Sequence, residues 1–540
     1  QSPIPNPHES IKKFNFSFFK YLKLIKHKLK RKKFNYFLII NCKMKAFICI
    51  IFLHQIFNIY LQGVDKLVFL YTHFRHGARA PLQVNDSFID KMGETWKNPE
   101  ELTGVGQRMH YLLGRRNRIR YINDGKTFLS TQFDPHEILI YSSNINRTMV
   151  SVSSQLQGFY PQDNQIGEKL TDAQIKIAYP QVNVNYEEIN NSISALGDSA
   201  LPYQMTLAPV RMVNDNDRKM RVYDIQECVE ERDDIKKKNA ETVPELIEYV
   251  KKFNEKYKTS FDKYLQDSNG EYDVFELYDI CDAFLSNYWD DRKMSDFKDK
   301  TGLNFTELNE DCFELTKNYF FYCFHGDEEK ALAHVDSSAL MRELIYFMKR
   351  RMDTDITPEN EDSNYKDYSR PKMLMRSGHD STVTADLLLL IKALGLNAKE
   401  KYSFPRYASQ LAIEVRTYKS ITSSSTYGDF YVVCYLDDKQ LFNVTADKFI
   451  DDLESEIWSD SKVNEFCGFD EISIEEEKSD KAKTAYKVLM SVFICLAAIF
   501  LATTIFLAYK LSKLNKPKPP IEPNYDINKA ENTDISIKNN

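Results

Sequence analysis

The stretch that decides the fold is KLVFLYTHFRHGARAP, Lys66–Pro81. Its first half is a short, unbroken apolar run, which is typical of a strand buried on both faces of a parallel sheet. The run ends abruptly in Arg75, His76 and Arg79, and the next acidic residue along the chain is Asp86. Because burying guanidinium charge is costly unless an anion neutralises it, the pattern predicts a buried strand whose carboxyl end binds an anionic ligand.

Two further apolar runs end in polar motifs, HEILIYSS at 136–143 and KMLMRS at 372–377. The first leads through SSNINRT to Arg147, and the second is followed by His379 and Asp380 in the motif RSGHDSTV. In open α/β sheets, ligands bind beyond the carboxyl ends of the parallel strands. If the three strands are neighbours, three arginines, two histidines and one carboxyl group meet in one pocket.

This set of side chains suits phosphoryl transfer without a metal or cofactor. Arginine supplies planar, bidentate donors that stay charged, and these take the place of a metal cation at a phosphate. A histidine nucleophile needs an unprotonated ring nitrogen, and the departing oxygen needs an acid. We therefore expect His76 to attack the phosphorus and Asp380 to protonate the leaving group. These two requirements are met together on the acid side of neutrality, which predicts a bell-shaped pH profile with its maximum between roughly pH 4 and 6.

Alternating strand and helix patterns predict an α/β core. After the third strand, residues 382–394 form a strongly apolar helical pattern that ends at Gly395. The runs 410–417 and 429–436 have the pattern of paired strands around a turn-rich loop. We expect a mainly parallel sheet flanked by helices. The two parts of this core are expected at residues 64–227 and 358–483.

The middle of the chain has a different composition. Residues 228–357 are charged, rich in Tyr and Phe and mostly helical in pattern, without a convincing parallel-strand run. We expect them to form an α-helical cap inserted between the two parts of the core. His325 and His334 lie nine residues apart, which is not a metal-ligand spacing, and we expect His325 to be structural. His73 is expected to be an ordinary strand residue.

Residues 44–63 have the layout of a secretory signal peptide: lysines flank Met44, an apolar run follows, and the segment ends in a small residue. The alternative is an N-terminal membrane anchor. With a signal peptide, Met44 is the native start, and residues 1–43 are a leader foreign to the native protein. The sequons at Asn85, Asn190, Asn304 and Asn443 fit an exported protein.

A second apolar segment, 488–509, has 22 residues without a charge, enough to span a bilayer. Four lysines follow at the start of the tail, 510–540, and predict that this side is cytoplasmic. We therefore expect one transmembrane helix and a single-pass type I protein whose catalytic body is lumenal or extracellular.

The chain beyond the leader is acidic. The whole chain has a net charge of −6, and residues 1–43 contribute +10, because they hold eleven basic residues and one acid. Residues 44–540 therefore have a net charge of −16. This charge argues against a nucleic-acid partner.

The motifs together resemble those of the histidine acid phosphatases, a branch of the phosphoglycerate-mutase-like superfamily. RHGARAP matches the family signature R-H-G-x-R-x-P, SSNINRTMVSVSSQLQGFYP (142–161) resembles the family's arginine segment, and SGHDSTV (377–383) resembles its second catalytic motif. The resemblance spans about residues 64–470. It implies an α/β core with a helical cap, and a membrane-anchored body similar to that of lysosomal acid phosphatase.

The resemblance also implies roles for single residues. His76 would be the nucleophile that forms a phosphohistidine, and Asp380 would be the acid and later the base. The phosphate would be held by Arg75, Arg79, Arg147 and His379. Position 78 is Ala, where prostatic-type members carry an acid and phytase-type members often carry Ala, so an inositol-phosphate phosphatase is an alternative. Another alternative is a catalytically inactive, membrane-anchored receptor or adhesion module. The resemblance leaves a homodimer open.

Six cysteines lie in the body, and an even set in an exported domain predicts three disulfides, with free buried thiols as the alternative. The resemblance implies that Cys228, at the start of the cap, pairs with Cys467 near the end of the body. The cysteine that the family carries after its H-D motif is missing, so at least one disulfide must differ. The other four cysteines leave three connectivities open: Cys281, Cys312, Cys323 and Cys434.

We predict that a peptide linking Cys228 to Cys467 is recovered when the protein is digested without reduction. Mass spectrometry before and after reduction identifies the linked pair. Recovery of either cysteine in a bridge to another residue would contradict the pairing that the resemblance implies.

Overall fold

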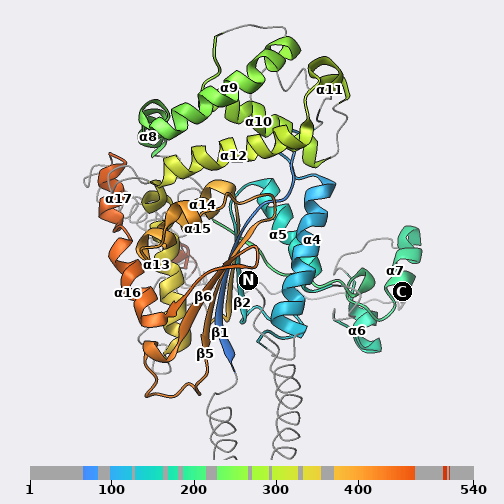
Figure 1. Ribbon diagram of the computed structural model, residues 1–540. Coiled ribbons are helices and arrows are strands. Elements are labelled where there is room, and N and C mark those ends of the chain that lie inside the picture. Colours follow the sequence, from blue (N-terminus) through green and yellow to red (C-terminus); the bar gives the residue numbers. More distant parts are fainter. Residues whose placement is uncertain are drawn as a thin grey trace, which may run out of the picture. The chain divides into compact units, whose positions relative to one another are not determined.

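The computed structural model (Figure 1) describes residues 65–82, 96, 98–123, 128–161, 168–179, 187–213, 228–265, 270–290, 295–325, 332–353, 370–468, 503–507 and 510. Its contacts divide the chain into two units, 1–463 and 464–540, and the fold below is that of the first. The predicted leader and signal peptide, and most of the predicted span 488–509, lie outside the described residues. Within the described ranges, no helix is long and apolar enough to cross a membrane.

The core is one sheet with the strand order β3-β2-β4-β1-β5-β6-β7. Strand β1 (Lys66–Arg75) runs parallel to β4 (Met373–Gly378), and β4 runs parallel to β2 (Ile138–Ser142). A short strand, β3 (Arg211–Met212), extends this side in parallel. Strands β1, β4 and β2 are the three apolar runs of the sequence, and they are neighbours, so their carboxyl ends share one edge.

The other half of the sheet is antiparallel, so the expectation of a mainly parallel sheet is wrong and the sheet is mixed. Strands β5 (Gln410–Thr417), β6 (Tyr431–Leu436) and β7 (Lys439–Thr445) follow β1 in antiparallel order. Asp437 and Asp438 alone connect β6 to β7, with φ of +48° and +66°. Two consecutive residues with left-handed backbones form a tight hairpin turn, which can connect antiparallel strands only. Parallel strands need a long crossover connection instead.

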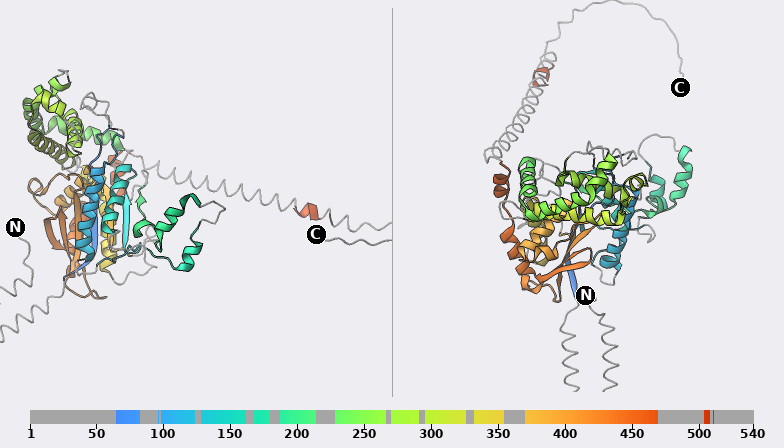
Figure 2. Two further views of the ribbon diagram at one scale, coloured as in Figure 1. Left: turned by 90° about the vertical axis from the view of Figure 1, so that its right-hand side faces the viewer. Right: turned by 45° about the horizontal axis from the view of Figure 1, so that its top comes forward.

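Helices cover both faces of the sheet (Figures 1 and 2). On one face, Leu70 and Phe74 of β1 join the core cluster that includes Val152 and Leu156 of α5 (Asn146–Phe159). Helix α4 (Gly104–Arg118) packs beside α5. On the other face, Tyr71 and His73 point to Asp386 of α14 (Asp380–Ala393). Alternate residues of β1 therefore serve opposite layers, as strand geometry requires. Helices α13 (Leu332–Met352) and α16 (Ala446–Glu456) pack against α14.

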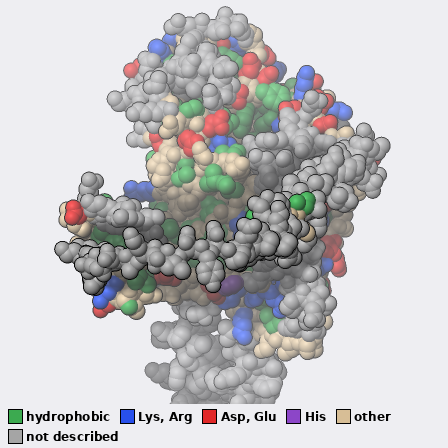
Figure 3. Space-filling view, turned by 180° about the vertical axis from the view of Figure 1, so that it is seen from behind, with side chains coloured by type: hydrophobic (Ala, Val, Ile, Leu, Met, Phe, Trp, Pro, Cys, Tyr) green, Lys and Arg blue, Asp and Glu red, His purple; other side chains and the backbone are tan. Residues whose placement is uncertain are grey.

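Five helices lie beyond the carboxyl ends of the parallel strands and are here called the cap helices (Figure 2). They are α8 (Val229–Thr242), α9 (Pro244–Leu265), α10 (Val274–Trp289), α11 (Ser295–Thr301) and α12 (Phe305–Phe324). On the face seen in Figure 3, acidic and basic side chains lie intermixed over this region. The predicted domain boundaries stay predictions, and α13, inside the segment 228–357, contacts β1 as well as α14.

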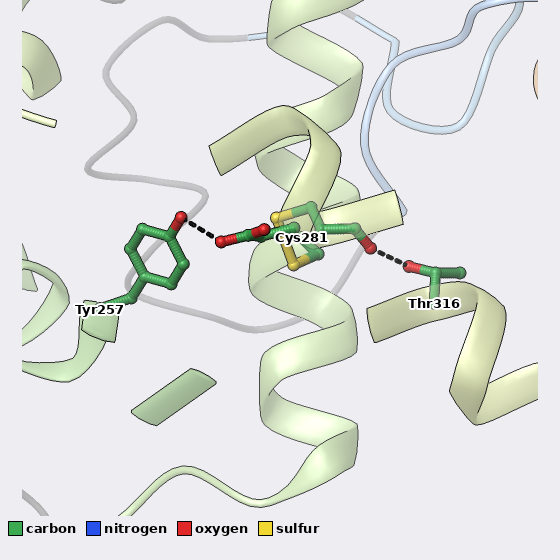
Figure 4. Close-up of a disulfide and its surroundings, with 5 residues drawn as sticks. Tyr257, Cys281 and Thr316 are labelled. Carbon is green, nitrogen blue, oxygen red and sulfur yellow. Dashed lines mark hydrogen bonds between the residues drawn. A yellow bond between two sulfur atoms is a disulfide. The ribbon is translucent and has the colours of Figure 1, made fainter. Parts of the chain in front are cut away.

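Two of the cap helices are linked covalently. A disulfide joins Cys281 of α10 to Cys312 of α12 (Figure 4). Cys228 and Cys467 are each disulfide-bonded as well, and their pairing with each other stays a prediction.

The expectation of three disulfides is wrong, because the two remaining cysteines are free. Cys323 and Cys434 are buried thiols in different layers, the first in cap helix α12 and the second in strand β6. Burial is the main cause that raises the pKa of both thiols, that of Cys323 to about 12. They therefore stay protonated and unreactive at ordinary pH.

The loop after β1 touches the first turn of α4 so closely that both positions require glycine. A Cβ atom on Gly77 would lie 2.5 Å from the carbonyl oxygen of Gly106, and one on Gly106 would lie 2.1 Å from that of Ala78. Both contacts are with backbone, which cannot rotate away. The approach fixes the loop that holds His76 and Arg79 against the start of α4.

We predict that Gly106→Ala destabilises the protein by about 2 kcal/mol or more, because the added methyl group forces the backbone apart. Gly104 is the matched control in the same helical turn, since nothing lies within 4 Å of a Cβ placed there. Urea denaturation of both variants measures the effect. Equal stability of the two would contradict the close approach.

Candidate functional site

The three motifs meet because their strands are adjacent and in register. Arg75, the last residue of β1, is opposite Gly378 of β4, and Ser142 of β2 is opposite Ser377. His76 continues from β1, and its backbone N–H donates to the carbonyl oxygen of Gly378 at 3.0 Å. All six residues singled out in the sequence lie at this edge, and five of them are buried, with Asp380 13% exposed.

The ring of His76 is held in one tautomer. Its Nδ1 lies 2.9 Å from the carbonyl oxygen of Gly77. Because a carbonyl oxygen only accepts hydrogen bonds, Nδ1 carries the proton and Nε2 carries the free lone pair. Burial is the main cause that holds the pKa of His76 well below its ordinary value, and the charges of Arg75 and Arg79 lower it further. The ring is therefore neutral, with an unprotonated nitrogen, even in mild acid.

Each of the three buried arginines is paired with a carboxylate from a distant part of the chain. Arg79 forms a bidentate pair with Asp282 of cap helix α10, at 2.7 and 3.1 Å. Arg75 Nη2 lies 2.8 Å from Asp380, and Arg147 Nη1 lies 3.1 Å from Glu100. The acidic partners that the local sequence lacks are thus supplied by the tertiary fold.

These pairs still leave donors that a phosphate can use. Arg75 Nε and Arg79 Nε are buried and have no hydrogen-bond partner in the described part of the chain. A buried donor without a partner costs roughly 1–3 kcal/mol, and native proteins keep such groups chiefly where they serve a function. Donors of this kind beside a neutral histidine fit an oxyanion such as a phosphoryl group.

His379 and Asp380 stand at the start of α14. The side chain of His379 contacts the hydroxyl of Ser143, which follows β2, at 3.0 Å, and its backbone N–H donates to Thr382 Oγ1 at 3.0 Å. Burial is the main cause that lowers the pKa of His379, and Arg147 adds to it. Asp380 accepts a hydrogen bond from the backbone N–H of Ser381 at 2.9 Å. A helix N-terminus also favours negative charge.

A second, fully buried network lies beneath this motif. The carboxylate of Asp386 accepts from Tyr71 at 2.8 Å and lies 2.7 Å from His73 Nδ1. The other ring nitrogen of His73 lies 3.2 Å from Thr382 Oγ1, the hydroxyl that holds the backbone of His379. His73 is therefore a strand residue that ties β1 to α14, as expected.

The other two histidines singled out in the sequence also have structural surroundings. His325 follows the last residue of α12 and stacks on Phe321, with ring centroids 4.9 Å apart. His334 lies 3.2 Å from Glu456 and stacks on Trp458. Among the described residues, no group of three or more His, Cys, Asp or Glu side chains is placed to hold a metal ion.

A pocket opens between the cap helices and the strand ends. From the core it is lined by Arg75, Asp380, Phe404 and Tyr407, and from the cap by Tyr278, Asp282, Leu285, Phe313 and Thr316. Tyr407 stacks under the guanidinium of Arg75, with its ring centroid 4.4 Å away.

Sequence reasoning missed the pocket residues outside the motifs, and Asp282 and Glu100 with them. Asp282 alone had a signal, because it is an acid within the apolar run ICDAFL of α10. The aromatic residues of the pocket resemble core residues in sequence. Nothing in the sequence marks Glu100; its distinguishing feature, a left-handed backbone with φ of +63°, is visible only in the structure.

We predict that His76 makes the folded protein less stable as pH falls. Its pKa is lowered in the folded state, so only the unfolded chain binds a proton there once pH drops below about 6.5. Relative to the parent, His76→Asn should therefore gain roughly 2 kcal/mol in free energy of unfolding between pH 7 and pH 5. Urea denaturation at several pH values measures this difference. A constant difference would show that folding does not shift the pKa of His76.

Comparison with known proteins identifies the family of this chain. A model of the histidine phosphatase superfamily (branch 2) matches residues 66–433. The lysosomal acid phosphatase of Xenopus laevis is 33% identical over 96 residues, which are 18% of this chain and 21% of that protein. Human prostatic acid phosphatase is 29% identical over 96 residues, 18% of this chain and 24% of that protein. The aligned segments thus span about a fifth to a quarter of these relatives.

Among solved structures, the phytase from Citrobacter braakii aligns with a TM-score of 0.45 at 13% identity, over 74% of this chain and 99% of that chain. The family match covers most of the chain and contains the six motif residues and the whole pocket lining. This chain therefore belongs to branch 2 of the histidine phosphatase superfamily.

Proposed function

We propose that this protein hydrolyses phosphomonoesters through a phosphohistidine intermediate on His76. The observation that carries the proposal is the state of His76: Nδ1 is tied to the carbonyl oxygen of Gly77, and Nε2 is unprotonated among three buried arginines. A neutral nucleophile surrounded by fixed positive charge is what attack on an anionic phosphoryl group requires.

In the first step, Nε2 of His76 attacks the phosphorus while the bond to the ester oxygen breaks. Arg75, Arg79, Arg147 and His379 hold the non-bridging oxygens, and protonated Asp380 gives its proton to the departing oxygen. In the second step, Asp380 takes a proton from a water molecule that attacks the phosphorus, and the bond to Nε2 breaks. Inorganic phosphate leaves, and both residues regain their starting states. Asp380 is poised for this role because it borders both Arg75 and the pocket.

We also propose that the cap helices bind the leaving group and that the body acts in an acidic lumen or outside the cell. The predicted sequon residues Asn190, Asn304 and Asn443 are exposed, which supports export. Anchoring by residues 488–509 as a type I span belongs to the same proposal and rests on the sequence alone. The inactive receptor is disfavoured, because such a protein has no need to keep all six residues at one strand edge.

The leaving group offers a sharp test of this mechanism. p-Nitrophenol departs with little help from an acid, whereas the alkoxide of glycerol 2-phosphate needs a proton. Asp380→Asn should therefore lower kcat about a hundredfold or more for glycerol 2-phosphate and much less for p-nitrophenyl phosphate. The parent should show a bell-shaped pH profile for both esters, with its maximum between roughly pH 4 and 6.

Asp386→Asn is the matched control, because this second aspartate of α14 is fully buried and does not line the pocket. It should slow the two esters by similar factors. Equal losses for both esters in Asp380→Asn would contradict the role of Asp380 as the acid. Absence of hydrolysis of either ester by the parent would overturn the proposed function.

A further inference from the structure

The cap wall of the pocket carries a buried carboxylate that the mechanism above does not use. Asp282 is 8% exposed and lines the pocket beside Tyr278 and Leu285 of the same helix. It accepts hydrogen bonds from both terminal nitrogens of Arg79 and from the backbone N–H of Leu82 at 3.0 Å. Three donors therefore hold one carboxylate in place at the mouth of the site.

The pairing limits what Arg79 can offer to a ligand. Its two terminal nitrogens are engaged with Asp282, and Nη1 also donates to the carbonyl oxygen of Ala80. Two of its five N–H donors are left: the second N–H of Nη2, and that of Nε, which is buried and without a partner in the described part of the chain. While the pair persists, three of the five N–H donors of Arg79 are taken, and at most two can reach a phosphoryl group.

The net positive charge around the site is enough to neutralise one phosphate group and no more. With Asp380 protonated for its acid role, three arginines face two carboxylates, Asp282 and Glu100, which leaves one net positive charge. A phosphomonoester carries about one negative charge below its second pKa of about 6. A second anionic group on the leaving side meets Asp282 and an aromatic wall, and among the described residues that line the pocket Arg75 is the only basic one.

The cap wall is held in position by a covalent link. The disulfide between Cys281 and Cys312 joins α10 to α12 (Figure 4), and Asp282 is the residue that follows Cys281 in α10. Thr316, which lines the pocket from α12, donates a hydrogen bond to the carbonyl oxygen of Cys312 at 2.8 Å. The α12 side of the pocket is therefore linked to the same disulfide. The wall therefore cannot easily turn Asp282 away from an incoming anion.

We propose that Asp282 is a specificity-determining residue that restricts the substrates to phosphomonoesters whose leaving group carries no further negative charge. The proposal rests on the proposed phosphatase function and deepens it. It disfavours inositol polyphosphates as substrates, although the alanine at position 78 leaves them open.

Two aryl esters of matched shape test the proposal at pH 5: phenyl phosphate and 4-carboxyphenyl phosphate. The parent should show kcat/KM about tenfold higher for phenyl phosphate, because a carboxylate beside Asp282 is repelled in a partly buried site. Asp282→Asn should bring the two values within about threefold of each other and should raise phytate hydrolysis relative to phenyl phosphate. The control Glu100→Gln changes another arginine partner, which is 41% exposed and outside the pocket lining, and should keep the parent ratio.

A parent ratio near one would overturn the proposal, even if Asp282→Asn does not fold. An unchanged ratio in folded Asp282→Asn would overturn it as well, and the phosphatase function would stand. If the parent hydrolyses neither ester, the proposed function fails and this inference fails with it.

Discussion

Three buried guanidinium groups at one edge of the sheet are the constraint on which the rest of the structure depends. Such charge is tolerated in a protein interior only when it is paired and hydrogen-bonded. The fold meets this requirement with carboxylates from three distant segments, through the pairs Arg75–Asp380, Arg79–Asp282 and Arg147–Glu100. The pairs leave buried Nε donors on Arg75 and Arg79, so the site keeps part of its capacity for an anion.

Burial, together with the same charges, sets the state of the histidines. Burial lowers the pKa of His76 and His379 most, and protonating either ring would also add positive charge to a site that already holds three arginines. Both rings therefore stay neutral, and the hydrogen bond from Nδ1 to Gly77 decides which nitrogen of His76 is free. The strand end itself thus prepares the proposed nucleophile, and the close approach of Gly77 to Gly106 keeps that strand end in place.

Much of this site was predictable because its residues lie in local patterns. Three apolar runs, followed by Arg75, Arg147 and His379, predicted three strands and the polar residues at their carboxyl ends. In the structure these strands are neighbours. The antiparallel half was missed in part because β7 is a mostly polar strand whose pairing depends on the two-residue turn at Asp437. Asp282 was missed because its partner lies 203 residues away, and no local pattern shows which distant acid reaches a buried arginine. For the same reason, the cysteine count did not show that Cys323 and Cys434 belong to different layers.

The most direct measurement of the central claim is the trapping of the covalent intermediate. The purified protein is mixed with ³²P-labelled p-nitrophenyl phosphate at pH 5, quenched within milliseconds, and digested under alkaline conditions that preserve phosphohistidine. The account predicts label on the peptide that contains His76, at Nε2, and none in His76→Ala with its fold intact. Turnover without labelled protein, or label on any other residue, would contradict it.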